Sequence, residues 1–342
     1  MNNEWQQYLT GNGAEILESG QVSFSGDNQL APSSALCALT GQIVLRITGD
    51  DAADFLQGQF SNDVAALGTP VSQLTTWSSP KGRVLTLFRL YKDEAGYLIA
   101  MPGELAESFT KRLRMYVLRA KVVVEEQPDL VCIGISGSSA GQQVNDAVGA
   151  VPSQTDDCVV RENVIATRIR GAMDRFEIIA PVNAAQKIWA AGYESSQPCG
   201  ETVWRLQNID AGVPGIGSQT TEAFVLQMLN LQHIDGVSFK KGCFPGQEVV
   251  ARMQYLGKLK RRMYRATGQV EDGFVPAPGD DVFNKDGNSA VGKIVDAQPV
   301  GDGSYRMLVV FAIASTEKPL YLEAEGVRAV ELMELPYSIE AS

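Results

Sequence analysis

Residues 239–252 read FKKGCFPGQEVVAR and place one cysteine in a short basic turn. A thiol reacts as its thiolate, and neighbouring cations such as Lys240 and Lys241 lower the pKa of a thiol from about 8.5 toward neutrality. Gly242 carries no side chain, so a ligand or another backbone segment can approach closely. Two interpretations follow. Cys243 is either a reactive thiol or a small apolar side chain that fills a turn.

The whole chain reads as a globular protein of more than one domain. A length of 342 residues predicts two or three domains. Hydrophobic residues make up 44% and charged residues 20%, which is ordinary for this class. No apolar run reaches the roughly 18 residues of a membrane span, and the start, MNNEWQQYLTGNG, lacks the features of a secretory signal. The five cysteines are scattered, which favours reduced thiols, so we expect a cytoplasmic protein.

The chain has a negative net charge, and its charged residues are unevenly distributed along the sequence. A net charge of −11 argues against binding nucleic acid over a wide surface. Two segments, 111–121 and 251–265, nevertheless carry several lysines and arginines and no acid. Such clusters indicate either a confined anion site or the solvated faces of a helix and a strand.

Periodicity in the first 130 residues predicts an α+β layer. The first 40 residues are polar and rich in glycine and serine, and they predict a short helix around 4–9 followed by a loop. Alternating apolar residues predict a strand over 43–49, followed by a helix that begins near Asp50. Residues 81–102 read as a hairpin, and helical spacing over 104–118 precedes the β-branched strand 121–126.

A second unit is expected from 129 onward. It contains paired strands at 164–170 and 175–181, then a helix around 184–193. Residues 137–157 are rich in glycine, serine and polar residues and predict a mobile loop.

The later part of the chain predicts helices and then a β-rich end. Residues 201–216 read as a helix stopped by Gly212, and the apolar spacing of 222–232 predicts another helix. After Arg261, short strands separated by glycine-rich turns predict a small barrel or sandwich. We therefore expect a domain over 1–130 that is completed by 200–260, a second domain over 131–200, and a third over 261–342.

Other catalytic patterns are missing or weak. The sequence has no C-x-x-C, no H-x-x-x-H, no phosphate-binding loop and no G-x-S-x-G, so we expect no metal site. His233 stands ten residues before Cys243, but nothing nearby would orient it as a base, and it fits the end of a helix better. Trp204 is either a stacking platform for a flat ring or a buried core residue.

At residues 239–252 the chain resembles the YgfZ family. The signature of that family is K-G-C, an aromatic residue, any residue, then G-Q-E, and this chain matches it from Lys241 to Glu248. The similarity continues through ITGDDAADFLQGQFSNDV (47–64) and WRLQNIDAGVPGI (204–216) and spans most of 36–340. Leu226 departs from the pattern, because members often carry proline at that position.

The resemblance implies an α+β fold of three domains in a ring around a central channel, with a small C-terminal β-barrel. It also implies tetrahydrofolate or a one-carbon derivative as ligand, and a role in supporting iron–sulfur enzymes such as tRNA methylthiotransferases. Cys243 and Lys241 would be the catalytic pair. The folate-binding residues it implies are Trp204, Gln227, Gln247, Glu248, Arg252 and Lys258.

The YgfZ family is related to an enzyme, the T-protein of the glycine cleavage system. That aminomethyltransferase typically carries paired aspartates after the first hairpin glycine, where this chain has Thr86 and Leu87. Neither side chain can act as a general base, so aminomethyl transfer is the less favoured alternative. A weak tRNA contact through Lys260, Arg261 and Arg262 is a third hypothesis.

Overall fold

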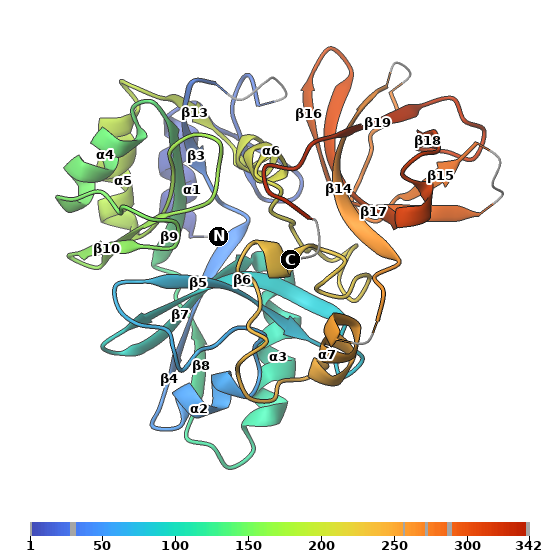
Figure 1. Cartoon of the computed structure of the whole chain (residues 1–342). Helices are drawn as coiled ribbons and strands as arrows, with labels where there is room; N and C mark the ends of the chain where they lie inside the picture. The colour runs from blue at the N-terminus through green and yellow to red at the C-terminus, as the bar shows by residue number, and fades with distance from the viewer. Residues whose placement is uncertain (1, 28–31, 256, 271–272, 286–288, 340–342) are drawn as a thin grey trace.

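A computed structural model describes residues 2–27, 32–255, 257–270, 273–285 and 289–339. Figure 1 shows three groups of strands arranged around a common centre, with helix α6 and the C-terminal end of the chain between them. A two-stranded ribbon, β1 (Glu15–Ile16) and β2 (Val22–Ser23), is added near the N-terminus. The expected α+β ring with a terminal barrel is therefore confirmed.

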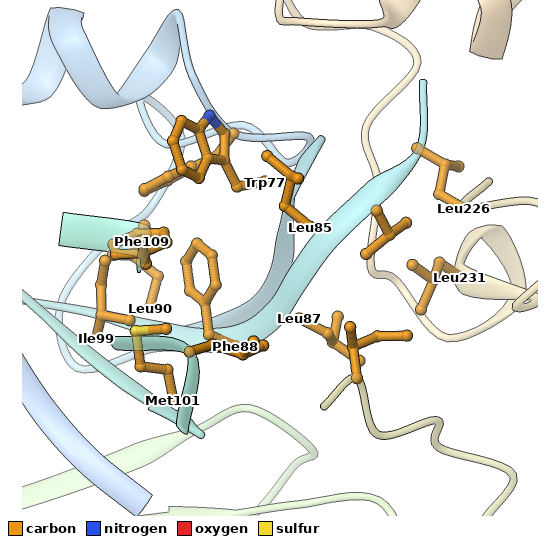
Figure 2. Close-up of a cluster of buried hydrophobic side chains, with 14 of the residues drawn as sticks. Trp77, Leu85, Leu87, Phe88, Leu90, Ile99, Met101, Phe109, Leu226 and Leu231 are labelled. Atoms are coloured by element: carbon orange, nitrogen blue, oxygen red, sulfur yellow. The ribbon is translucent and has the colours of Figure 1, made fainter. Parts of the chain in front are cut away.

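A five-stranded sheet forms the lower group of strands in Figure 1. Its strands, in spatial order, are β5 (Ser72–Ser78), β6 (Val84–Asp93), β7 (Gly96–Pro102), β4 (Gln42–Thr48) and β8 (Val123–Glu126). The helices of this part are α2 (Ala52–Gln57) and α3 (Ala106–Val117), with α3 following a single 3₁₀ turn, η1 (Gly103–Leu105). Phe88 and Phe109 meet edge to face in its core, which Figure 2 shows together with Leu226 and Leu231 from a distant segment.

A six-stranded sheet forms the second group. Its strands, in spatial order, are β10 (Cys158–Arg161), β11 (Val164–Arg168), β12 (Arg175–Pro181), β9 (Leu130–Gly137), β3 (Ser34–Ala38) and β13 (Gln197–Cys199). Its helices are α1 (Asn3–Gly11), α4 (Ala140–Val148) and α5 (Val182–Gly192). The predicted pairing of 164–170 with 175–181 is confirmed by the antiparallel register of β11 and β12.

The third group is a closed barrel. Its strands, in spatial order, are β14 (Arg261–Gln269), β17 (Ser304–Ala312), β16 (Ala290–Gly301), β15 (Asp281–Asn284), β18 (Leu320–Tyr321) and β19 (Ala329–Met333). A 3₁₀ turn, η3 (Ile313–Ser315), follows β17. Helix α6 (Glu201–Asp210) joins the barrel to the rest, because Arg205 pairs with Asp296 of β16 and Arg306 of β17 pairs with Asp210.

The helix predicted over 222–232 is wrong. The segment forms successive turns that end in a 3₁₀ turn, η2 (Leu231–His233). Its start pairs with the start of β6, where the Val84 amide donates to the carbonyl of Phe224. Phe224, Leu226, Leu229 and Leu231 are buried in the core of the lower sheet, although the segment that carries them is not a helix. The spacing alone does not distinguish these two arrangements.

Two further predictions of local structure need correction. The predicted loop 137–157 contains α4, which buries Ala140, Val144 and Val148 at helical spacing. The polar region before residue 40 contains β3, fully buried inside the six-stranded sheet. The division into 1–130 with 200–260, 131–200 and 261–342 stays a prediction. Within it, β3 has its strand partners in the second sheet, and residues 340–342 lie outside the described residues.

Candidate functional site

A cavity of about 1430 Å³ lies at the centre of the ring. The two large sheets, α3, α6 and the barrel strand β16 all contribute lining residues. The α6 wall is one face of that helix, since Glu201, Trp204, Arg205 and Asn208 recur at helical spacing. These four residues face the cavity because the opposite face of α6 is apolar and buries Val203, Leu206 and Ile209 in the core.

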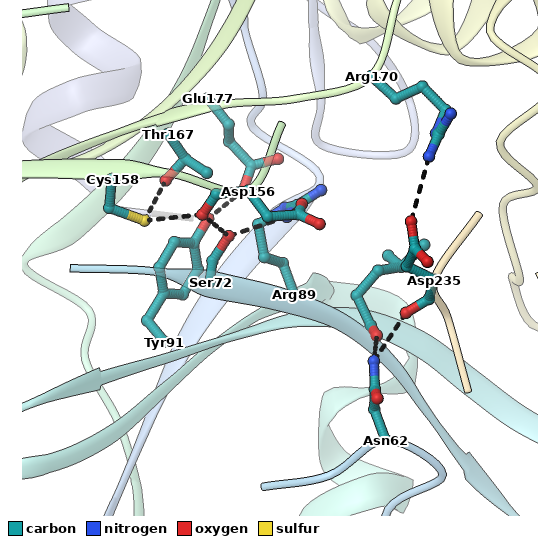
Figure 3. A network of polar contacts seen from close by, with 11 residues as sticks. Asn62, Ser72, Arg89, Tyr91, Asp156, Cys158, Thr167, Arg170, Glu177 and Asp235 are labelled. Atoms are coloured by element: carbon teal, nitrogen blue, oxygen red, sulfur yellow. Dashed lines mark hydrogen bonds and ion pairs between the residues drawn. The ribbon is translucent and has the colours of Figure 1, made fainter. Parts of the chain in front are cut away.

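A polar network joins the two sheets at the cavity wall (Figure 3). Arg89 of β6 forms an ion pair with Asp156, and its Nη1 donates to Ser72 Oγ over 2.9 Å. The hydroxyl of Tyr91 donates to Oε1 of Glu177 on β12 over 2.7 Å. Burial opposes the charge on Arg89, but Asp156 and its other neighbours more than offset this and raise the pKa of Arg89.

Arg170 and Glu201 also line the cavity and make polar contacts with neighbouring segments. Arg170 reaches Asp235 over 3.4 Å, and the amide of Asn62 donates to the Asp235 carbonyl over 2.7 Å (Figure 3). At the start of α6, Glu201 accepts from the Gly41 amide over 2.8 Å. Burial raises the pKa of Glu201, although this hydrogen bond acts in the opposite direction.

Trp204 lines the cavity but is only 4% exposed. The Arg175 guanidinium lies 4.3 Å from the centre of its ring. A Cβ on Gly134 of β9 would stand 2.5 Å from the ring, so this glycine makes room for the indole. The structure therefore brings Trp204 to the cavity as a tightly packed wall. Its predicted contact with folate stays a prediction.

Lys241 is 7% exposed and lies at the end of α2. Its ammonium group donates to the carbonyls of Gln57 and Phe60, each over 2.6 Å, and to that of Asn62 over 3.0 Å. A cation is favoured at a helix C-terminus, where carbonyls lack partners. Burial lowers the pKa of Lys241 to about 8. This geometry supports a structural role for Lys241, and its activation of the thiol stays a prediction.

Cys243 is exposed, whereas the other four cysteines are buried. It lies just before α7 (Gln247–Tyr255), in the loop that the sequence singled out. Cys243 does not line the cavity. The thiol and the central cavity are thus separate features of the molecule.

The predicted folate residues are not gathered around the cavity, apart from Trp204. Gln227 is 3% exposed, and its amide donates to the Val250 carbonyl over 2.6 Å, which anchors α7. Gln247 donates to the Gly242 carbonyl over 3.4 Å. Glu248, Arg252 and Lys258 are exposed on or after α7 and lie outside the cavity wall.

The sequence reasoning missed most of the polar cavity wall, including Arg89, Glu177 and Asn208. The strands that carry Arg89 and Glu177 were predicted from their apolar residues alone. On the helix that carries Asn208, Trp204 was the residue proposed for the site. A charged residue within an otherwise apolar strand was the available signal. Among the described residues, no group of three or more His, Cys, Asp or Glu side chains is placed to hold a metal ion.

A protein from Colwellia psychrerythraea named tRNA-modifying protein YgfZ is 30% identical over 317 residues, which cover 91% of this chain and 95% of the relative. The chain belongs to the YgfZ family. YgfZ proteins of the same name from Yersinia pestis and Klebsiella pneumoniae are 28% and 27% identical, each over 307 residues covering 89% of this chain and 92% and 93% of theirs. No family model matches the chain.

The fold of this YgfZ family member is shared with a T-protein. The aminomethyltransferase T of the glycine cleavage system from Bartonella henselae superimposes with a TM-score of 0.75 over 96% of both chains, at 15% identity. At that identity the likeness concerns the fold alone. Among the described residues, no helix has the length and apolar character needed to cross a membrane.

Proposed function

We propose that this protein binds tetrahydrofolate or a one-carbon derivative in its central cavity and supports tRNA modification. The single observation that carries the proposal is the large cavity walled by Trp204 in a chain of the YgfZ family. Ligand pockets usually measure about 300–1,000 Å³, so the 1430 Å³ cavity has room for a folate and ordered water.

The residues present fit such a ligand. Leu87, Ile169 and Val213 supply apolar lining for a flat ring. Glu177 offers a carboxylate whose Oε1 is already held by Tyr91, and Asn208 offers an amide. Arg170 and Arg205 also line the cavity. Each is paired with a carboxylate of the protein, Asp235 or Asp296, and has further N–H donors for anionic groups such as the carboxylates of a folate tail.

Cys243 is the functional thiol in this proposal, and its clients are iron–sulfur enzymes such as tRNA methylthiotransferases. Its exposure supports the proposal because a client protein can reach the sulfur directly. Since Cys243 lies outside the cavity wall, the thiol would serve the client while the cavity holds the folate. The reduced sulfur can lend one ligand to an iron–sulfur cluster in transit, with the cluster as cargo.

Two experiments test the proposal. Isothermal titration of the purified protein with folinic acid, an air-stable reduced folate, is expected to show saturable binding, and a Trp204→Ala variant should bind more weakly. Separately, cells that lack the endogenous protein are supplied with either the native chain or the Cys243→Ala variant. The variant is expected to support less tRNA methylthiolation than the native chain. Absence of folate binding by the native chain would overturn the ligand assignment, and unchanged methylthiolation would overturn the role of the thiol.

The alternative function is a folate-dependent transfer of a one-carbon unit to an amine, as in the T-protein. Leu87 lines the cavity and Thr86 is buried, so neither replaces the carboxylates that such a reaction uses. Incubation with methylenetetrahydrofolate and candidate amines separates the two, because turnover would favour the enzyme.

A third hypothesis is a weak tRNA contact through the exposed Lys260 and Arg261. It predicts that the protein binds tRNA at low salt and that the affinity falls steeply as the salt concentration rises.

A further inference from the structure

Arg175 is a buried cation without a carboxylate partner among the described residues. It is 1% exposed, and no carboxylate lies within ion-pair distance of it. Burial lowers the pKa of Arg175 to about 10, which still leaves it protonated at neutral pH. Burying an unpaired charge is costly, so the contacts that this group makes instead have to be strong and specific.

Most of those contacts are to residues of α6. Nη1 donates to the carbonyls of Arg170 over 3.0 Å and Gln207 over 3.3 Å, and Nη2 donates to the Trp204 carbonyl over 3.4 Å. The guanidinium also lies against the Trp204 ring. Its shortest contact is to a side chain, from Nη2 to Oδ1 of Asn208 over 2.8 Å.

This last contact decides the orientation of an amide that lines the cavity. A guanidinium has five donors and no acceptor, so the Asn208 atom that faces it has to be the oxygen. The amino group, Nδ2, then points away from Arg175, and no described residue accepts a hydrogen bond from it. An asparagine can normally rotate to offer either a donor or an acceptor, but here Arg175 holds Oδ1 in place and Nδ2 is the group without a partner, so this amide meets a ligand first as a donor.

We infer that Asn208 is a specificity-determining residue of the central cavity and that Arg175 is the positioning residue that orients it. The α6 wall therefore selects a ligand that presents a hydrogen-bond acceptor, such as a ring carbonyl oxygen or an unprotonated ring nitrogen, beside the Trp204 indole. A ligand that presents only an N–H group to Nδ2 binds more weakly, because two donors would face each other. The inference rests on the proposed function, since it names the group of the folate site that reads the heterocycle.

The decisive variant is Asn208→Asp. It keeps the shape of the side chain and gives the buried Arg175 a carboxylate, so a purely structural role for Asn208 predicts equal or higher thermal stability and unchanged binding. Our inference predicts stability that is equal or higher but folinic acid binding that is about tenfold weaker or worse, because the only donor is replaced by an acceptor. The two properties move in opposite directions, which a merely damaged fold would not produce.

Variants at Arg175 complete the test. Arg175→Lys keeps a cation that can donate to Oδ1 of Asn208 and is expected to bind folinic acid more tightly than Arg175→Met, which frees the amide to rotate. If Asn208→Asp fails to fold, the lysine and methionine variants still test the inference, and equal affinities for the two would overturn it.

The possible failures are distinguishable. If the native protein does not bind folinic acid, the proposed function is wrong, and so is the role of Asn208 that depends on it. Native protein that binds, together with an Asn208→Asp variant that binds within about twofold, overturns the inference alone.

Discussion

Gly82 and Gly246 form a close backbone contact between the β5–β6 turn and the loop that carries Cys243. A Cβ on Gly246 would stand 2.5 Å from the Cα of Gly82 and 2.6 Å from the carbonyl oxygen of Ser79. Both glycines have positive φ, 70° at Gly82 and 81° at Gly246. The turn of the lower sheet therefore fixes where the loop with the thiol lies, and it explains why both segments carry glycine.

Replacing Gly246 with alanine is expected to destabilise the protein strongly. The new Cβ would strike backbone atoms that cannot rotate away, and the backbone conformation at this position disfavours any side chain. We expect a loss of about 2–4 kcal/mol in the free energy of unfolding, measured by urea denaturation.

Gly242 is the matched control for this change. It lies four residues earlier in the same loop, and a Cβ there would meet nothing within 4 Å. Gly242→Ala should change the free energy of unfolding by less than about 0.5 kcal/mol. Equal losses for the two alanine variants would contradict the role assigned to the contact with Gly82.

The same loop also depends on Lys241. Replacing it with methionine keeps the aliphatic stem but leaves the carbonyls of Gln57, Phe60 and Asn62 without their donor. Leaving buried acceptors unpaired is expected to cost about 2–3 kcal/mol in the free energy of unfolding. Lys240→Met is the control, because Lys240 is exposed and its replacement should be close to neutral. A neutral Lys241→Met variant that instead slowed modification of Cys243 would favour the predicted activation of the thiol over the structural role.

The resemblance to the YgfZ family predicted the ring, the β-rich end of the sequence predicted a barrel or sandwich, and the cysteine loop was singled out with two interpretations left open, but the composition of the cavity was not predicted. Periodicity identified α6 and its end at Gly212, which has a φ of 66°. It failed at 222–232, where apolar spacing fits both a helix and a buried chain of turns. Arg89, Glu177 and Asn208 meet only because separate elements converge, and local patterns do not report such long-range contacts. The exposed residues of α7 were assigned to the ligand by motif, whereas the structure places them outside the cavity wall.

Thiol accessibility provides a direct check on the loop. Under native conditions we expect an aromatic disulfide reagent to modify one cysteine rapidly, because only Cys243 among the five is exposed. All five should react in denaturant. Cys243→Ser should abolish the rapid phase, and Cys199→Ser should leave it unchanged. A rapid phase that survives in Cys243→Ser would show that another thiol opens to solvent.

The last prediction concerns the C-terminal segment, which crosses the centre of the ring beside α6 (Figure 1). The hydroxyl of Tyr337 donates to the carbonyl of Gly212 over 2.7 Å, and its ring stacks on His233 at 6.4 Å between ring centres. Burial raises the pKa of Tyr337 to about 12, above the value of about 10 for a free phenol. The folded state therefore holds this proton more tightly than the unfolded state does.

Between pH of about 10 and 12 the unfolded chain loses the Tyr337 proton while the folded protein retains it, so stability falls as pH rises through this window. Tyr337→Phe lacks the titrating group and should lose less stability over the same window, although it is less stable than the native chain at neutral pH because the Gly212 carbonyl has lost its donor. The difference in urea midpoint between the two proteins should therefore shrink from pH of about 9 to about 11.5. Other groups titrate there too, but they are common to both proteins and cancel in the difference. A constant difference would mean that the Tyr337 hydroxyl is already open to solvent, and the burial inferred for it would be wrong.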